Sequence, residues 1–91
     1  MDPDVVTIGL GYIGLPTSAL IASKETYVLG VDINQKVVDT VNSGKIHIVE
    51  PDLDKVVSSA VEKGYFRAST VPIAANVYLI VVPTPFNENH E

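Results

Sequence analysis

Three glycines near the start of the chain have a spacing that suits phosphate binding. Gly9, Gly11 and Gly14 form a G-x-G-x-x-G pattern between an apolar, β-branched run and a segment able to form a helix. Gly9 permits a tight turn, Gly11 lets the backbone approach a phosphate, and Gly14 allows close packing of helix against strand. The N–H groups of Tyr12 and Ile13 then point toward a pyrophosphate at the positive end of the helix dipole. The pattern predicts a dinucleotide site, although a glycine-rich turn that binds nothing has the same three residues.

A carboxylate after the second apolar run supports this interpretation. Asp32 follows the glycines by about 20 residues, which in a βαβ unit places it beside the glycine loop, within reach of an adenosine ribose. A carboxylate that accepts hydrogen bonds from both ribose hydroxyls repels a 2′-phosphate, so NAD is preferred to NADP. The simpler explanation of Asp32 is an ordinary strand-end or helix-capping aspartate. Lys36, a turn further on, could tolerate a 2′-phosphate, but a solvated helix lysine is the simpler interpretation and NAD stays preferred.

A Pro-Thr-Pro turn follows the last apolar run of the chain. Two prolines fix the backbone around Thr84, at the sheet edge where open α/β sheets bind ligands. The hydroxyl and carbonyl of Thr84 are therefore candidates to face the nicotinamide half of the cofactor. A rigid strand terminator explains the same prolines equally well.

Neither a metal site nor a catalytic group is predicted. His47 and Glu50, with Asp52 and Asp54, have no defined ligand spacing, and acids at a helix N-terminus explain the two aspartates. The chain has no cysteine, which excludes disulfides, thiolate metal sites and a catalytic thiol among its 91 residues.

The elements that position these residues alternate as in a parallel α/β sheet. Apolar runs at 4–8, 26–31, 65–69 and 77–82 predict strands, and 12–23, 35–42 and 52–63 predict helices. The run 4–8 is continuously apolar, as in a central strand, and we place 77–82 on its other side. Ile13, Ala19 and Leu20 are expected to pack on the sheet, and Asn34 to cap the second helix. The predicted fold class is α/β: a Rossmann-like, mostly parallel sheet with flanking helices, a partial domain of about four strands.

Composition and charge restrict the class of protein. The chain is 46% hydrophobic and has a net charge of −5, from 11 acidic and 6 basic residues. The basic residues are scattered, so no nucleic-acid partner is expected. The apolar runs are shorter than the roughly 18 residues of a membrane span, and residues 1–4 lack a signal peptide's basic region. We expect a globular, cytoplasmic protein without a membrane partner.

Four ordered motifs resemble the N-terminal, NAD-binding part of the UDP-glucose/GDP-mannose dehydrogenase family. They are Gly9–Pro16, Gly30–Asn34, Glu50–Leu53 and Val82–Pro85. The run 46–53, with 67–70 and the Pro-Thr-Pro-Phe ending, is most similar to the members that act on UDP-N-acetyl-D-mannosamine.

The resemblance implies an NAD-dependent, two-step, four-electron oxidation of a sugar C6 alcohol to a carboxylate, for surface polysaccharide synthesis. By position, it also implies that Tyr12, Ile13, Asp32 and Thr84 contact NAD. The nucleophilic cysteine and the nucleotide-sugar site of such enzymes lie in middle and C-terminal domains. Residues 1–91 are accordingly expected to be the first part of the NAD-binding domain, inactive alone, from an enzyme that forms a homo-oligomer.

Two alternatives use the same residues. One is another NAD-dependent dehydrogenase with this half-fold, of the hydroxyacid or 6-phosphogluconate type. The other is a nucleotide-binding module without catalytic activity.

Overall fold

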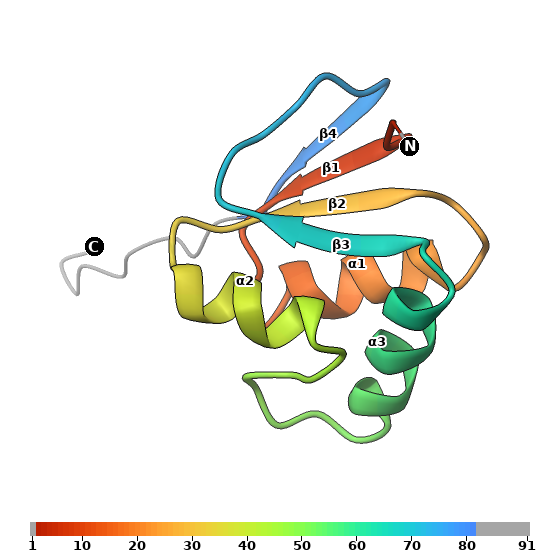
Figure 1. Ribbon diagram of the computed structural model, residues 1–91, viewed down its shortest axis with the longest axis vertical. Helices are drawn as coiled ribbons and strands as arrows, with labels where there is room; N and C mark the ends of the chain where they lie inside the picture. The colour runs from red at the N-terminus through yellow and green to blue at the C-terminus, as the bar shows by residue number, and fades with distance from the viewer. Residues whose placement is uncertain (1, 82–91) are drawn as a thin grey trace, which may run out of the picture.

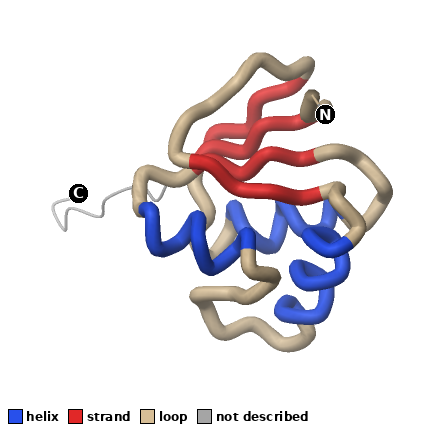
Figure 2. Tube along the Cα trace, in the orientation of Figure 1, coloured by secondary structure: helices blue, strands red, loops and turns tan. Residues whose placement is uncertain are grey.

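The described part of the chain forms a parallel sheet with its helices on one face (Figure 1, Figure 2). The computed structural model describes residues 2–81. Its strands are β1 (Val5–Ile8), β2 (Val28–Val31), β3 (Phe66–Ser69) and β4 (Val77–Ile80), and its helices are α1 (Gly14–Ala22), α2 (Gln35–Asn42) and α3 (Leu53–Glu62). The four strands lie in the order β3-β2-β1-β4. The predicted Rossmann-like α/β class is confirmed.

Strand β1 is central, as its continuous apolar sequence predicts. Val5 pairs with Val28 of β2 on one side and with Val77 of β4 on the other, and both pairings are parallel. Because the strand order reverses at β1, the carboxyl ends of β1 and β4 border the crevice in which open α/β sheets bind ligands. The predicted strand 77–82 is confirmed in its place beside β1, with its last residue, Val82, outside the described part of the chain.

The main core lies between the sheet and the helices. Its largest buried side chains include Leu10, Leu15, Val41, Val57 and Phe66. On the other face, a smaller cluster of Val6, Leu29 and Val31 has Ala75 packed against it. The helix-covered face therefore supplies most of the burial that fixes the glycine loop at the end of β1.

Two local predictions about the helices had opposite outcomes. Asn34 caps α2 as predicted, because its side-chain oxygen accepts a 2.9 Å hydrogen bond from the Lys36 N–H. The prediction that Ile13 and Leu20 pack on the sheet is wrong, since these side chains are 68% and 61% exposed. Only Ala19 of the predicted three is buried. The apolar residues of α1 are distributed around its whole circumference, so its sequence contains no periodicity that distinguishes the inner face.

Candidate functional site

The glycine loop is anchored to the end of β2 by its first two residues. Gly9 has a φ of 103°, in the region that favours glycine, and its N–H donates a 2.7 Å hydrogen bond to the Val31 carbonyl. The Leu10 side chain is fully buried and lies against Gly30, where an added Cβ would approach its Cδ2 to 2.6 Å. Because Gly30 of β2 has no side chain, the Leu10 side chain fits against the strand and anchors the loop there.

Gly14 and Gly11 are glycines for different reasons. A Cβ at Gly14 would lie 1.7 Å from the Gly9 carbonyl oxygen, so the close approach of α1 to the loop requires glycine. A Cβ at Gly11 would meet no atom within 4 Å, and Gly11 does not have a positive φ. The fold itself places no demand for glycine at position 11. The space above it suits a ligand that approaches the backbone.

Three backbone N–H groups at the start of α1 are unpaired within the described residues. The Gly11 carbonyl accepts the first helical hydrogen bond, from the Leu15 N–H at 3.1 Å. Within residues 2–81, the N–H groups of Gly11, Tyr12 and Ile13 have no hydrogen-bond acceptor. Helix N-terminal donors of this kind, at the positive end of the helix dipole, form an anion-binding site.

Asp32 joins the glycine loop to the end of β2. Its Oδ2 accepts a 3.1 Å hydrogen bond from the Leu10 N–H, and its Oδ1 accepts one of 2.9 Å from the Asn34 N–H. The Asp32 N–H donates to the Ser69 carbonyl of β3 at 3.1 Å. The structure therefore brings Asp32 and the glycines together at one edge of the sheet, with the carboxylate partly exposed.

The remaining cofactor-binding candidate of the sequence, Thr84, lies outside the described residues. No group of three or more His, Asp and Glu side chains in residues 2–81 is placed to hold a metal ion. Sequence reasoning missed Leu10 and Ser69, which position Asp32 through backbone groups. The sequence feature that could have indicated the role of Leu10 is Gly30, because a residue without a side chain inside an otherwise apolar strand leaves room for a buried side chain from elsewhere.

The family of the chain follows from a match along nearly its whole length. The family model described as "UDP-glucose/GDP-mannose dehydrogenase family, NAD binding domain" matches residues 3–91. The chain belongs to this dehydrogenase family. The matched domain is the family's NAD-binding domain, which confirms NAD as the predicted cofactor.

Individual relatives of the dehydrogenase family agree with the match. UDP-N-acetyl-D-mannosamine dehydrogenase of Escherichia coli K12 is 62% identical over 87 residues, which are 96% of this chain and 21% of that protein. The structure of a UDP-N-acetyl-mannosamine dehydrogenase from Staphylococcus aureus has a TM-score of 0.88 at 46% identity, over 92% of this chain and 20% of that one. A ternary complex of GDP-mannose dehydrogenase from Pseudomonas aeruginosa has a TM-score of 0.92 at 28% identity, covering 97% of this chain and 21% of its own.

These comparisons confirm the similarity to UDP-N-acetyl-D-mannosamine dehydrogenases. The chain spans about a fifth of the length of the curated relatives it matches. No helix within residues 2–81 is long and apolar enough to cross a membrane.

Proposed function

We propose that the glycine loop and Asp32 hold the adenosine diphosphate half of NAD in a nucleotide-sugar 6-dehydrogenase. The observation that carries the proposal is the position of the Asp32 carboxylate, hydrogen-bonded to the loop N–H of Leu10 beside the unpaired N–H groups of Tyr12 and Ile13. One edge of the sheet thus offers donors for a pyrophosphate and an acceptor for a ribose.

The residues present fit the cofactor. The space above Gly11 admits a phosphate, and the N–H groups of Tyr12 and Ile13, which have no acceptor within residues 2–81, are its donors. When bound, NAD supplies the hydride acceptor of the oxidation. This chain binds and orients it, while the negative charge of Asp32 opposes a 2′-phosphate. Thr84 completes the proposed site near the nicotinamide.

The proposed substrate is UDP-N-acetyl-D-mannosamine, which is oxidised at C6 to UDP-N-acetyl-D-mannosaminuronate. Oxidation of an alcohol to a carboxylate removes four electrons, so each sugar consumes two NAD and one water. The support is the 62% identity to the Escherichia coli dehydrogenase that carries this substrate in its name. A cytoplasmic reaction in surface polysaccharide synthesis and a homo-oligomeric enzyme are parts of the same proposal.

We further propose that residues 1–91 form the first part of the NAD-binding domain and need middle and C-terminal domains for turnover. The support is that the chain spans about a fifth of its relatives' length. Hydride transfer requires a sugar held against the nicotinamide, and no catalytic residue is assigned to this segment. Alone, the chain is expected to bind NAD without oxidising a sugar.

Calorimetric titration of the chain with NAD, NADP and AMP tests the cofactor site. We expect NAD to bind at least about tenfold more tightly than NADP, and Asp32→Ala to remove that preference. Lys36→Ala, on the exposed side of α2, is the matched control and should preserve it. Saturable binding that is equal for wild type and Asp32→Ala would exclude this site.

A chimaeric enzyme tests the activity separately. Residues 3–91 replace the matching segment of the Escherichia coli relative, and NADH formation is followed with UDP-N-acetyl-D-mannosamine. Two NADH per sugar are expected. A folded chimaera that binds NAD without oxidising this sugar would show that residues 3–91 do not support turnover, while leaving the cofactor site intact.

A further inference from the structure

Leu10 connects the hydrophobic core to the glycine loop. Its side chain is fully buried in the main core, while its N–H donates the 3.1 Å hydrogen bond to Oδ2 of Asp32. The preceding N–H, of Gly9, is bonded to the Val31 carbonyl at 2.7 Å. The next N–H, of Gly11, is the first of the three that have no acceptor in the described part of the chain. At Leu10, therefore, the part of the loop that is fixed to the sheet gives way to the part that is proposed to bind phosphate.

The Leu10 side chain fits tightly between two strands. A Cβ added at Gly30 of β2 would lie 2.6 Å and 2.9 Å from the two Cδ atoms of Leu10. The same Cβ would lie 3.1 Å from Cε1 of Phe66 in β3, a side chain that is only 2% exposed. Distances under 3.0 Å essentially never occur for real Cβ atoms, so even one methyl group at Gly30 has to displace Leu10.

We propose, on the basis of the function proposed above for this loop, that the contact between Leu10 and Gly30 sets the affinity for NAD from inside the core. When Leu10 moves, its hydrogen bond to Asp32 and the direction of the neighbouring N–H groups change together. The acceptor for the ribose and the donors for the pyrophosphate are then disturbed at the same time. Leu10 and Gly30 are thus positioning residues, which act through the loop backbone and through Asp32.

A double variant separates positioning from general damage to the core. Gly30→Ala adds a methyl group that collides with Leu10, and Leu10→Val removes the side-chain ends that this methyl group meets. The double variant moves one carbon from the loop to the strand and keeps the total number of side-chain carbons. Because volume-conserving exchanges are the best tolerated changes in a core, the double variant is expected to restore the position of the loop.

Amide hydrogen exchange, followed by NMR on the 91-residue chain, reports the position of the loop without any ligand. In Gly30→Ala the Leu10 N–H should exchange about tenfold faster than in the wild type, because its hydrogen bond to Asp32 is weakened. Leu10→Val, which adds no atom to the core, should show a smaller increase of about threefold. The double variant should regain most of the protection.

Leu29→Val is the matched control for these exchange rates. It makes the same change of leucine to valine in the neighbouring residue of β2, but Leu29 packs in the smaller cluster on the other face of the sheet. The Leu10 N–H should therefore exchange as in the wild type, and circular dichroism checks the fold of each variant. Equal exchange in the wild type and Gly30→Ala, or a folded double variant without recovery, would overturn the proposal.

Calorimetric titration with NAD then measures the effect on the cofactor. Gly30→Ala should weaken NAD binding by about tenfold, and the double variant should bind within about threefold of the wild type. A wild type that does not bind NAD would reject the proposed function and this inference with it. NAD binding that depends on Asp32 but is equal in the wild type and Gly30→Ala would overturn this inference alone.

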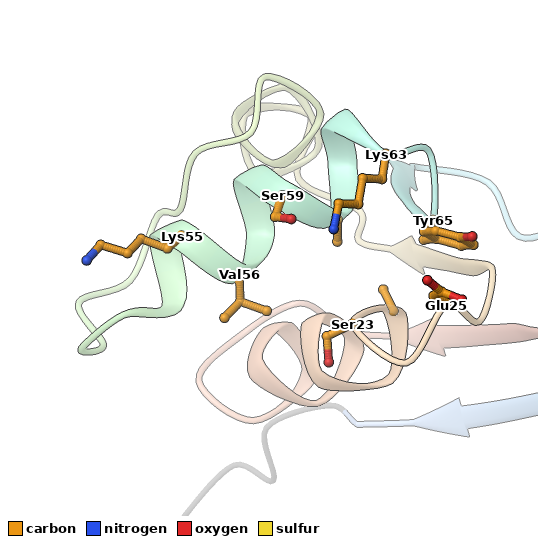
Figure 3. A pocket seen from close by; sticks show the side chains of 9 residues that line it. Ser23, Glu25, Lys55, Val56, Ser59, Lys63 and Tyr65 are labelled. Atoms are coloured by element: carbon orange, nitrogen blue, oxygen red, sulfur yellow. The ribbon is translucent and has the colours of Figure 1, made fainter.

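A hollow at the opposite end of α1 is the competing place for a phosphate-containing ligand. It has a volume of about 330 Å³ and lies between α1 and α3, and Lys63 points from α3 toward α1 there (Figure 3). A ligand bound in this hollow would lose affinity in Lys63→Ala and not in Gly30→Ala. We expect the reverse, with NAD affinity unchanged in Lys63→Ala, and the opposite pattern would overturn the proposal.

Discussion

Two glycines of the same loop are expected to respond to alanine in opposite ways. At Gly14 the new Cβ would lie 1.7 Å from the Gly9 carbonyl oxygen, whereas ordinary contact begins at 3.4 Å. Either α1 or the loop must move by well over an ångström, and the loop is fixed by the 2.7 Å hydrogen bond from Gly9 to Val31. We expect Gly14→Ala to lower the free energy of unfolding by about 3 kcal/mol or more, the upper part of the range for overpacking. That is a large share of the roughly 5–15 kcal/mol that stabilises a typical domain.

At Gly11 the new Cβ meets no protein atom within 4 Å. Alanine also restricts the unfolded chain, so the free energy of unfolding should stay within about 1 kcal/mol of the wild type. The methyl group occupies the space in which a phosphate approaches the N–H groups of Tyr12 and Ile13. Loss of those charge-assisted hydrogen bonds should weaken NAD binding by about tenfold or more, which is about 1.4 kcal/mol or more.

Urea denaturation followed by circular dichroism measures the stability of both variants, and calorimetry measures NAD binding by those that fold. The two glycines serve as each other's control, because the chemical change is identical. If Gly11→Ala lost as much stability as Gly14→Ala, or bound NAD as tightly as the wild type, the separation of a packing glycine from a ligand glycine would be refuted.

Three further changes test other parts of the structure. The Thr7 hydroxyl is buried and has no hydrogen-bond partner in the described part of the chain, so Thr7→Val should raise the free energy of unfolding by about 1 kcal/mol in urea denaturation; a loss would reveal a hidden partner. The Asn42 side-chain amide donates a 2.9 Å hydrogen bond to the Ala68 carbonyl and accepts one of 2.8 Å from the Ala68 N–H, at the outer edge of β3. Asn42→Ala should lower the free energy of unfolding by about 1–2 kcal/mol in the same assay. An unchanged urea midpoint would show that water replaces these two hydrogen bonds. The Glu25 carboxylate is the main cause that raises the pKa of Tyr65 above 10.0, so Glu25→Gln should let the phenolate form at lower pH in an absorbance titration; an unaltered curve would contradict this cause.

The ends of the strands were predictable because chemistry restricts the residues there. A tight turn with a positive φ requires glycine at position 9, and close helix packing requires it at position 14. Both requirements are therefore visible in the sequence as glycines. Asp32 was predictable from its place after an apolar run. Its hydrogen bond to the Leu10 N–H was not, because any residue at position 10 supplies the same backbone group.

The orientation of α1 could not be predicted, for a different physical reason. Periodicity assigns the inner face of a helix only when the other face is polar, and α1 has Leu15 inside and Leu20 outside. In α2 and α3 polar residues separate the faces, and the inner residues Val41 and Val57 are buried. The failure at α1 is therefore informative: a helix whose sequence does not indicate a solvent-facing side is one whose outer side we expect to be covered.

The site also explains how one carboxylate can hold the loop and still recognise a ribose. A carboxylate has two oxygens with about four acceptor positions. In Asp32 one position on each oxygen is used, by the Leu10 and Asn34 N–H groups, and the side chain remains partly exposed. The remaining positions are available to the two ribose hydroxyls without loss of either internal hydrogen bond. Because the acceptor is already oriented by the chain, ligand binding does not have to fix that side chain, and the free energy of the new hydrogen bonds goes into affinity.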